Sequence, residues 1–323
     1  MSSSEPLMSP SNNVTPDHRG PVVDVSIWIF FVLSGLSVVS KVLTKLARAS
    51  SEISLRKLQI DDFVLSLTQV LALGTTISIS RQVAAGLGTP LETLSEASIA
   101  GYEKAAYASQ LLYVCALCAA NSAAIIFGLM LQPSKNHQLY LKATQGFGFV
   151  WLIVSIFGIA FQCKLPQPWA LLRNQCFDQR AFWAFVEATN LATNFAITVV
   201  LIAIVWGLQM KTPKTKYLLA LVFGTRSLLI IPVAFKLSYM FHRGLTHDTG
   251  NWNPTSDSVE EVILTSVIMN ASIAIACLPF MKTLMESLQP GWSTGQVRPG
   301  VGYDIMVTKT FENSSYPLSG LSR

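Results

Sequence analysis

Seven apolar segments, each long enough to cross a bilayer as an α-helix, constrain the fold of this chain more than any other feature. A bilayer core of about 30 Å needs roughly 20 helical residues. Charged residues make up only 13% of the sequence, whereas a soluble domain carries about 25%. The chain is therefore expected to be an all-α bundle of seven transmembrane helices, at residues 22–42, 61–80, 107–131, 143–162, 182–208, 217–239 and 259–281.

Polar sequence flanks the seven segments on both sides. Residues 1–21 contain several Ser and Pro and lack the short apolar core of a removable signal peptide. The last part of the chain is rich in Pro, Gly and Ser and has no apolar period. We expect a disordered extracellular stretch at 1–21, a membrane domain at 22–284 and a disordered cytoplasmic tail at 285–323.

The distribution of Lys and Arg predicts the orientation in the membrane. These residues are more frequent in the tail and in the loops after the first, third and fifth segments than in the remaining loops. Because cytoplasmic loops carry the excess of positive charge, we expect the C-terminus in the cytoplasm and the N-terminus outside. The sequon Asn13-Val14-Thr15 would then be exposed to glycosylation. The membrane would be the plasma membrane or another membrane of the secretory pathway.

Two cysteines lie in the loop between the fourth and fifth segments. Cys163 and Cys176 are separated by a stretch that contains Pro166, Pro168 and Trp169. Such a compact spacing lets two thiols meet in an oxidising compartment and leaves them free in a reducing one. The orientation inferred from the positive charges places this loop on the oxidising side, so a disulfide is expected.

The fifth segment carries a row of polar residues inside the membrane. Glu187, Asn190, Asn194 and Thr198 follow one another at helical spacing and share one face. Polar groups in a transmembrane helix are costly, so this face is expected to point into the bundle. Glu187 lies near the outer end, where water could reach it, and the two asparagines lie deeper.

Arg226 in the sixth segment marks a second polar region. Counting 1.5 Å per residue from the cytoplasmic ends places polar residues of the other segments at a similar depth. No acidic residue is among them, so amides, backbone carbonyls, water or an anionic ligand would have to solvate Arg226. Hydrogen bonds that join helices and a ligand site both explain such a layer. The candidates are Arg226, Gln69, Asn121, Thr198 and Asn270, with Ser34, Ser37 and Ser122 beside them.

Asp61 and Asp62 begin the second segment. A helix N-terminus favours negatively charged side chains in its first turn. These two residues are therefore expected to have a structural role.

The chemistry that is absent narrows the function. The last segment has a lysine only at its cytoplasmic edge, Lys282, which argues against a retinal-binding light-driven pump. The four His residues lie outside the segments without metal-ligand spacing, and Cys115 and Cys118 are three residues apart in an apolar helix. No nucleophile–base pair, cofactor motif or nucleic-acid-binding pattern stands out. We expect neither a metal nor a cofactor.

From residue 25 to residue 284 the chain resembles the fungal rhodopsin-domain family, seven-helix integral membrane proteins of filamentous fungi that are related to adhesion-signalling receptors. The most specific mark is Phe161-Gln162-Cys163 followed by Cys176. The other marks are Asp61-Asp62, Gly86-Leu87-Gly88, Tyr113, Pro166, Trp169, Asn190, Thr193, Trp206, Leu208-Gln209-Met210, Gly224, Asn270 and Cys277-Leu278-Pro279. The chain departs from the family pattern at Thr89, Ala120 and Asn194, where charged or ionisable residues are usual.

Three functions agree with this resemblance. A receptor-like protein would bind a small apolar ligand under the cysteine loop and contact an unidentified cytoplasmic partner through its basic loops. An intramembrane enzyme or accessory protein of a secondary-metabolite pathway, of the cyclase or isomerase type, would need a proton donor such as Glu187 in the cavity, with Asn190 and Asn194 orienting the substrate. A scaffold would need only membrane lipid around it.

Overall fold

The computed structural model describes residues 19–48, 60–131, 133–172, 176–207, 213–247, 255 and 258–288. The glycosylation candidate Asn13, nearly all of the expected N-terminal stretch and the tail beyond residue 288 lie outside the described residues. Within them the helices are α1 (Gly20–Arg48), α2 (Ile60–Ala84), α3 (Glu96–Met130), α4 (Lys135–Ala160), α5 (Gln179–Gly207), α6 (Pro213–Gly224), α7 (Ile230–His247) and α8 (Val259–Leu288). Two short 3-10 helices are η2 (Leu91–Thr93) and η3 (Thr225–Leu229).

Seven helical spans in the described part of the chain are long and apolar enough to cross a membrane, which confirms the predicted all-α fold. Six of these spans each consist of a single α-helix. The remaining one, Ala220–His242, runs through α6, η3 and α7. The outer faces carry large apolar side chains, such as Leu36 (58% exposed) and Phe157 (60% exposed). Such faces suit contact with lipid chains.

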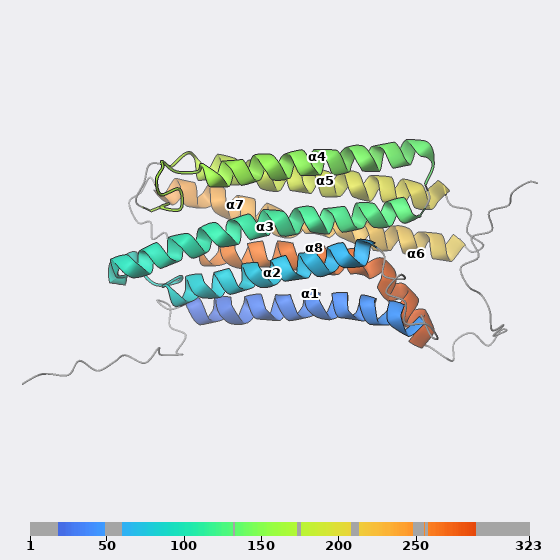
Figure 1. Cartoon of the computed structure of the whole chain (residues 1–323), viewed down its shortest axis with the longest axis horizontal. Helices are drawn as coiled ribbons and strands as arrows, with labels where there is room; N and C mark the ends of the chain where they lie inside the picture. Colours follow the sequence, from blue (N-terminus) through green and yellow to red (C-terminus); the bar gives the residue numbers. More distant parts are fainter. Residues whose placement is uncertain are drawn as a thin grey trace, which may run out of the picture. The chain divides into compact units, whose positions relative to one another are not determined.

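The helix α3 lies at the centre of the bundle. It packs against α2, α4 and α5, while α1 packs against α2 (Figure 1). It begins at Glu96, earlier than the predicted start at residue 107, so the polar stretch before residue 107 is part of the same helix. Ser95 caps this start by accepting a hydrogen bond from the Ser98 amide at 3.2 Å. Hydropathy alone does not detect such a polar extension.

Because successive spans alternate in direction, α4 ends and α5 begins at the same end of the bundle, which we call the disulfide end (Figure 1). Cys163 and Cys176 are joined there by the predicted disulfide. The turn between α2 and α3 lies at this end as well. Gly88 has a positive φ of 87°, and a side chain there would meet the Gly20 backbone nitrogen at 2.8 Å, so the turn needs glycine.

Candidate functional site

A cavity of about 540 Å³ opens inside the disulfide end. Residues of α2, α3, α5, α7 and α8 form its wall, together with the loop that follows the first cysteine. Its lining mixes apolar side chains, such as Ile79 and Val262, with polar ones, such as Gln110 and Lys236. Pockets of this size are typical of sites for small molecules.

A buried ion pair lies at the inner end of the cavity. Lys236 of α7 places its Nζ 2.5 Å from Glu187 Oε1 of α5, and both side chains are almost fully buried. The Tyr113 hydroxyl of α3 donates to the same carboxylate oxygen at 2.8 Å. The Lys236 ammonium lies 4.9 Å from the centre of the Tyr113 ring and 5.2 Å from that of Trp183, within cation–π range. The four residues therefore solvate one positive and one negative charge inside the bundle.

Glu187 is less accessible than its place in the sequence suggests. Water is expected near the outer end of the fifth segment, but Glu187 is fully buried. Lys236, Tyr113 and Trp183 belong to the cavity wall, whereas Glu187 lies behind them and is not among the described lining residues. Its second oxygen, Oε2, is buried and has no hydrogen-bond partner within the described part of the chain.

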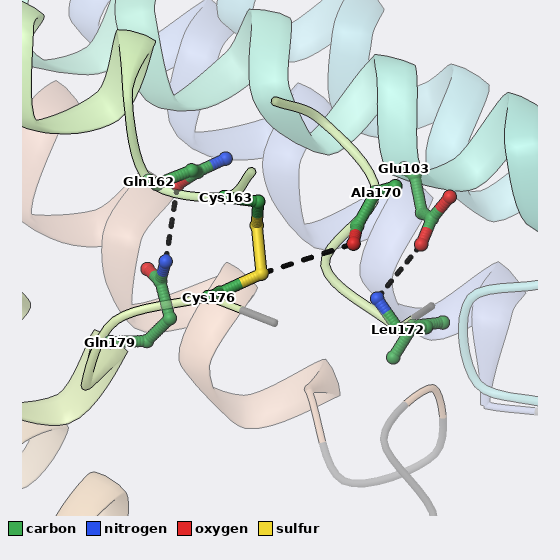
Figure 2. The surroundings of a disulfide bond; sticks show 7 residues. All are labelled: Glu103, Gln162, Cys163, Ala170, Leu172, Cys176 and Gln179. Atoms are coloured by element: carbon green, nitrogen blue, oxygen red, sulfur yellow. Dashed lines mark hydrogen bonds between the residues drawn. A yellow bond between two sulfur atoms is a disulfide. The ribbon is translucent and has the colours of Figure 1, made fainter. Parts of the chain in front are cut away.

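The disulfide loop covers the cavity from outside. Leu172 and Cys176 contribute to the wall. Figure 2 shows how the loop is held: the disulfide joins its two ends, and the buried Glu103 of α3 accepts a hydrogen bond from the Leu172 amide at 2.8 Å. The Gln179 side chain also donates to Gln162 Oε1 at 3.4 Å (Figure 2). The loop is therefore tied both to itself and to the central helix.

Deeper in the bundle, the hydrogen bonds of Arg226 within the described residues all go to asparagine side chains. Its guanidinium donates to Asn121 Oδ1 of α3 at 2.7 Å and to Asn194 Oδ1 of α5 at 2.8 and 3.1 Å. Asn121 and Asn194 in turn donate to Asn190 Oδ1, each at 3.1 Å. All four residues are buried. Asn190 and Asn194 of the predicted fifth-helix face thus meet Arg226 and Asn121 of the predicted layer in one cluster.

A break in the sixth span gives Arg226 its position. The α-helix gives way to η3 at Thr225–Leu229 and resumes at Ile230. A continuous helix would need an amide hydrogen on residue 232 to bond the Leu228 carbonyl, but Pro232 has none and its ring clashes with that carbonyl. A tighter 3-10 helix just before Pro232, as seen in η3, is therefore expected.

Ser34, Gln69 and Asn270 of the predicted polar layer form a separate group. Ser34 of α1 donates to Asn270 Oδ1 of α8 at 2.7 Å, and Gln69 of α2 lies 3.4 Å from the Ser34 hydroxyl. Thr198 bonds the backbone of its own helix, at Asn194 O. The layer thus contains an Arg226 cluster and a Ser34 cluster, and the second joins α1, α2 and α8 as structural hydrogen bonds do.

Asp61 and Asp62 form an ion cluster at the opposite end of the bundle. Lys41 Nζ lies 2.7 Å from Asp61 Oδ2. The side chains of Lys41, Asp61 and Asp62 are each at most 1% exposed. Lys45, whose side chain is 24% exposed, lies 2.6 Å from Asp62 Oδ2. The helix N-terminus alone was the expected partner of these aspartates, but two lysines of α1 add to it. Among the described residues, no group of three His, Cys, Asp or Glu side chains could hold a metal ion.

Comparison with known protein families identifies the chain. The model of the fungal rhodopsin domain matches residues 47–287. The chain belongs to the fungal rhodopsin domain family. No curated protein matches it. The match begins at the end of α1, later than the resemblance at residue 25, and it includes every helix that lines the cavity.

Lys236 of the rhodopsin domain belongs to the site but does not follow from the polar pattern of the fifth segment. Lys236 stands within the sixth apolar segment, where a charged side chain is itself a signal of function or pairing. Its partner Glu187 is 49 residues away in sequence, so only the packing of α5 against α7 brings the two together. Tyr113 and Trp183 likewise look like ordinary core aromatics until the fold is known.

Proposed function

We propose that this protein is a receptor-like member of its family that binds a small molecule in the cavity at the disulfide end. The observation that carries the proposal is the cavity of about 540 Å³ whose inner wall presents Lys236, a side chain only 2% exposed. Burying an ion pair costs free energy because both charges lose their hydration, so a pair placed at a cavity wall is a functional candidate. A bound ligand gives this arrangement a use.

The cavity and the Arg226 cluster join the same three spans. The helix α3 supplies Tyr113 above and Asn121 below, and α5 supplies Glu187 above and Asn194 below. Along either helix the two levels are about 11–12 Å apart at 1.5 Å per residue. The sixth span supplies Arg226 within its break and Lys236 beyond it. A ligand that moves Lys236 therefore acts on the same span that carries Arg226.

This geometry favours binding over catalysis by Glu187. A cyclase or isomerase of this type needs a proton donor that reaches the substrate. Glu187 already binds Lys236 and Tyr113 through one oxygen and lies behind the cavity wall. Glu187 is therefore not placed to act as the proton donor of the enzyme alternative, and the acidic side chains that line the cavity are Asp178 and Glu261.

We also propose that the disulfide end faces outside and the opposite end, with its basic loops, faces the cytoplasm. The distribution of positive charge supports this orientation. A receptor would then take its ligand from outside or from the outer leaflet and contact its cytoplasmic partner at the other end. An epitope at the C-terminus should accordingly be accessible to antibody only after the cells are permeabilised.

Stabilisation by adamantane, a compact hydrocarbon, tests ligand binding. A ligand that binds only the folded protein raises its unfolding temperature. In lipid nanodiscs, adamantane should raise the unfolding temperature of the wild type but not of Ala106→Trp, which fills the cavity from α3. Ala188→Trp, on the exposed face of α5, is the matched control and should respond like the wild type. Equal shifts in all three proteins would mean that adamantane acts through the lipid, and the proposal would fail.

A further inference from the structure

The inner wall of the cavity offers a hydrogen-bond donor. An ammonium group has three N–H bonds. Glu187 Oε1 accepts one from Lys236, and the rings of Tyr113 and Trp183 cover other sides of the group. Because Lys236 also belongs to the cavity wall, its remaining hydrogen-bonding capacity is directed to whatever occupies the cavity.

The same wall offers an acceptor. Gln110 lies on α3 one helical turn from Tyr113 and lines the cavity. Its Oε1 is buried and, within the described residues, has no hydrogen-bond partner. A buried carbonyl oxygen without a partner costs free energy, which a ligand or water that donates to it would recover. A ligand group that both accepts and donates a hydrogen bond would therefore satisfy this wall.

The ion pair at this wall favours a neutral end group, while Asp178, Arg180 and Glu261 are further charged side chains of the cavity lining. The positive charge of Lys236 is already balanced by Glu187 at 2.5 Å. A ligand carboxylate at Lys236 would lie close to the Glu187 carboxylate, and a ligand ammonium would lie close to Lys236 itself. Like charges repel strongly where water is scarce. At Lys236 both kinds of ion therefore bind less well than a neutral group of the same shape.

Another part of the cavity wall suits an apolar body. Ile79, Leu171, Met240 and Val262 contribute apolar surface to the wall. Burying apolar ligand surface against such side chains is favourable in proportion to the area removed from water. The recognisable features of a ligand are thus an apolar body and one polar end.

We propose that the cavity recognises a neutral, mostly apolar molecule that carries a hydroxyl or carboxamide group, which accepts a hydrogen bond from Lys236 and donates one to Gln110. This inference rests on the proposed function, because it names the class of ligand for the same cavity. It does not depend on a signalling response.

A series of adamantane derivatives that share one apolar body tests the inference. 1-Adamantanol and 1-adamantanecarboxamide carry neutral end groups, whereas 1-adamantanecarboxylate and 1-adamantanamine are charged at pH 7. The concentration for half-maximal thermal stabilisation in nanodiscs should be about tenfold lower for the alcohol and the carboxamide than for adamantane or either ion, as one well-placed hydrogen bond predicts. Gln110→Met should remove most of this advantage and leave the binding of adamantane unchanged.

Each outcome decides the matter. Tightest binding of the carboxylate would overturn the inference in favour of an anion site at Lys236. Equal binding of all derivatives, unaffected by Gln110→Met, would overturn it while the proposed cavity function stands. If no derivative, adamantane included, stabilises the protein in a way that Ala106→Trp abolishes, the proposed function fails together with the inference.

Discussion

Lys236 and Glu187, which lie 49 residues apart in sequence, form a buried ion pair at 2.5 Å between α7 and α5. The pair borders the cavity, and Tyr113 of α3 completes it. Three of the spans that form the bundle are thereby linked at the level at which a ligand would bind. The same spans are linked again at Arg226, Asn121 and Asn194.

Removal of one member of the ion pair should destabilise the protein more than removal of both. Lys236→Met leaves the Glu187 carboxylate buried without its counter-charge, which costs about 3–5 kcal/mol. The double variant Lys236→Met/Glu187→Gln leaves no buried charge and should recover most of that loss. The free energy of unfolding in mixed micelles measures both effects. Additive losses in the two single variants and the double variant would show that the pair is not coupled.

Arg226 should depend on the shape of its side chain as well as on its charge. Arg226→Gln removes the charged hydrogen bonds to Asn121 and Asn194, for an expected loss of about 2–3 kcal/mol. Arg226→Lys keeps the charge but cannot reproduce the planar fork that reaches both asparagines. Its unfolding free energy should therefore lie close to that of the Gln variant. Wild-type stability of Arg226→Lys would contradict the bonding seen here.

The two lysines of the Asp61–Asp62 cluster should differ in importance. Lys41 is buried, so Lys41→Met should cost about 3–5 kcal/mol, with little dependence on salt. Lys45 is partly exposed, and Lys45→Met should cost less than about 1 kcal/mol, an effect that salt screens. Thermal unfolding at low and high salt compares the variants, which carry the same substitution four residues apart. A larger loss for Lys45→Met than for Lys41→Met would refute this assignment.

Loss of the disulfide should affect both stability and the cavity. Cys163→Ser/Cys176→Ser opens a loop whose ends are 13 residues apart, at a cost of about 3 kcal/mol in the chain-entropy model. Because Leu171, Leu172 and Cys176 belong to the cavity wall, stabilisation by adamantane should fall as well. Cys115→Ser, which removes a free thiol of α3, serves as the control and should retain it. If adamantane still stabilised the double variant, the disulfide loop would not contribute to binding in the cavity.

The spans could be predicted from the sequence because their signal is local. Apolar length identifies each helix, and the polar face of α5 follows from helical spacing alone. The early start of α3 at Glu96 was not predicted, because it is a polar helical extension with a capping serine. The break at η3 agrees with the kink that Pro232 allows in the sixth segment, although a hydropathy window does not measure it.

The partners in the site could not be predicted, because they depend on how each helix is rotated about its axis. Arg226 and Asn121 are 105 residues apart, and nothing local to either indicates that they meet. Lys236 illustrates the same limit, since its burial and its ion pair appear only when α7 packs against α5. The disulfide was predictable because both cysteines lie in one short loop between adjacent spans.

Photolabelling with adamantyl diazirine in native membranes tests the central claim, that the cavity holds a small molecule, most directly. The light-generated carbene inserts where the probe is bound, and peptide mass spectrometry locates the modified residues. We predict labelling on α3 between Ala106 and Tyr113 and at Trp183, abolished by Ala106→Trp and retained in Ala188→Trp. Labelling confined to lipid-facing side chains such as Phe195, and unchanged by Ala106→Trp, would contradict the claim.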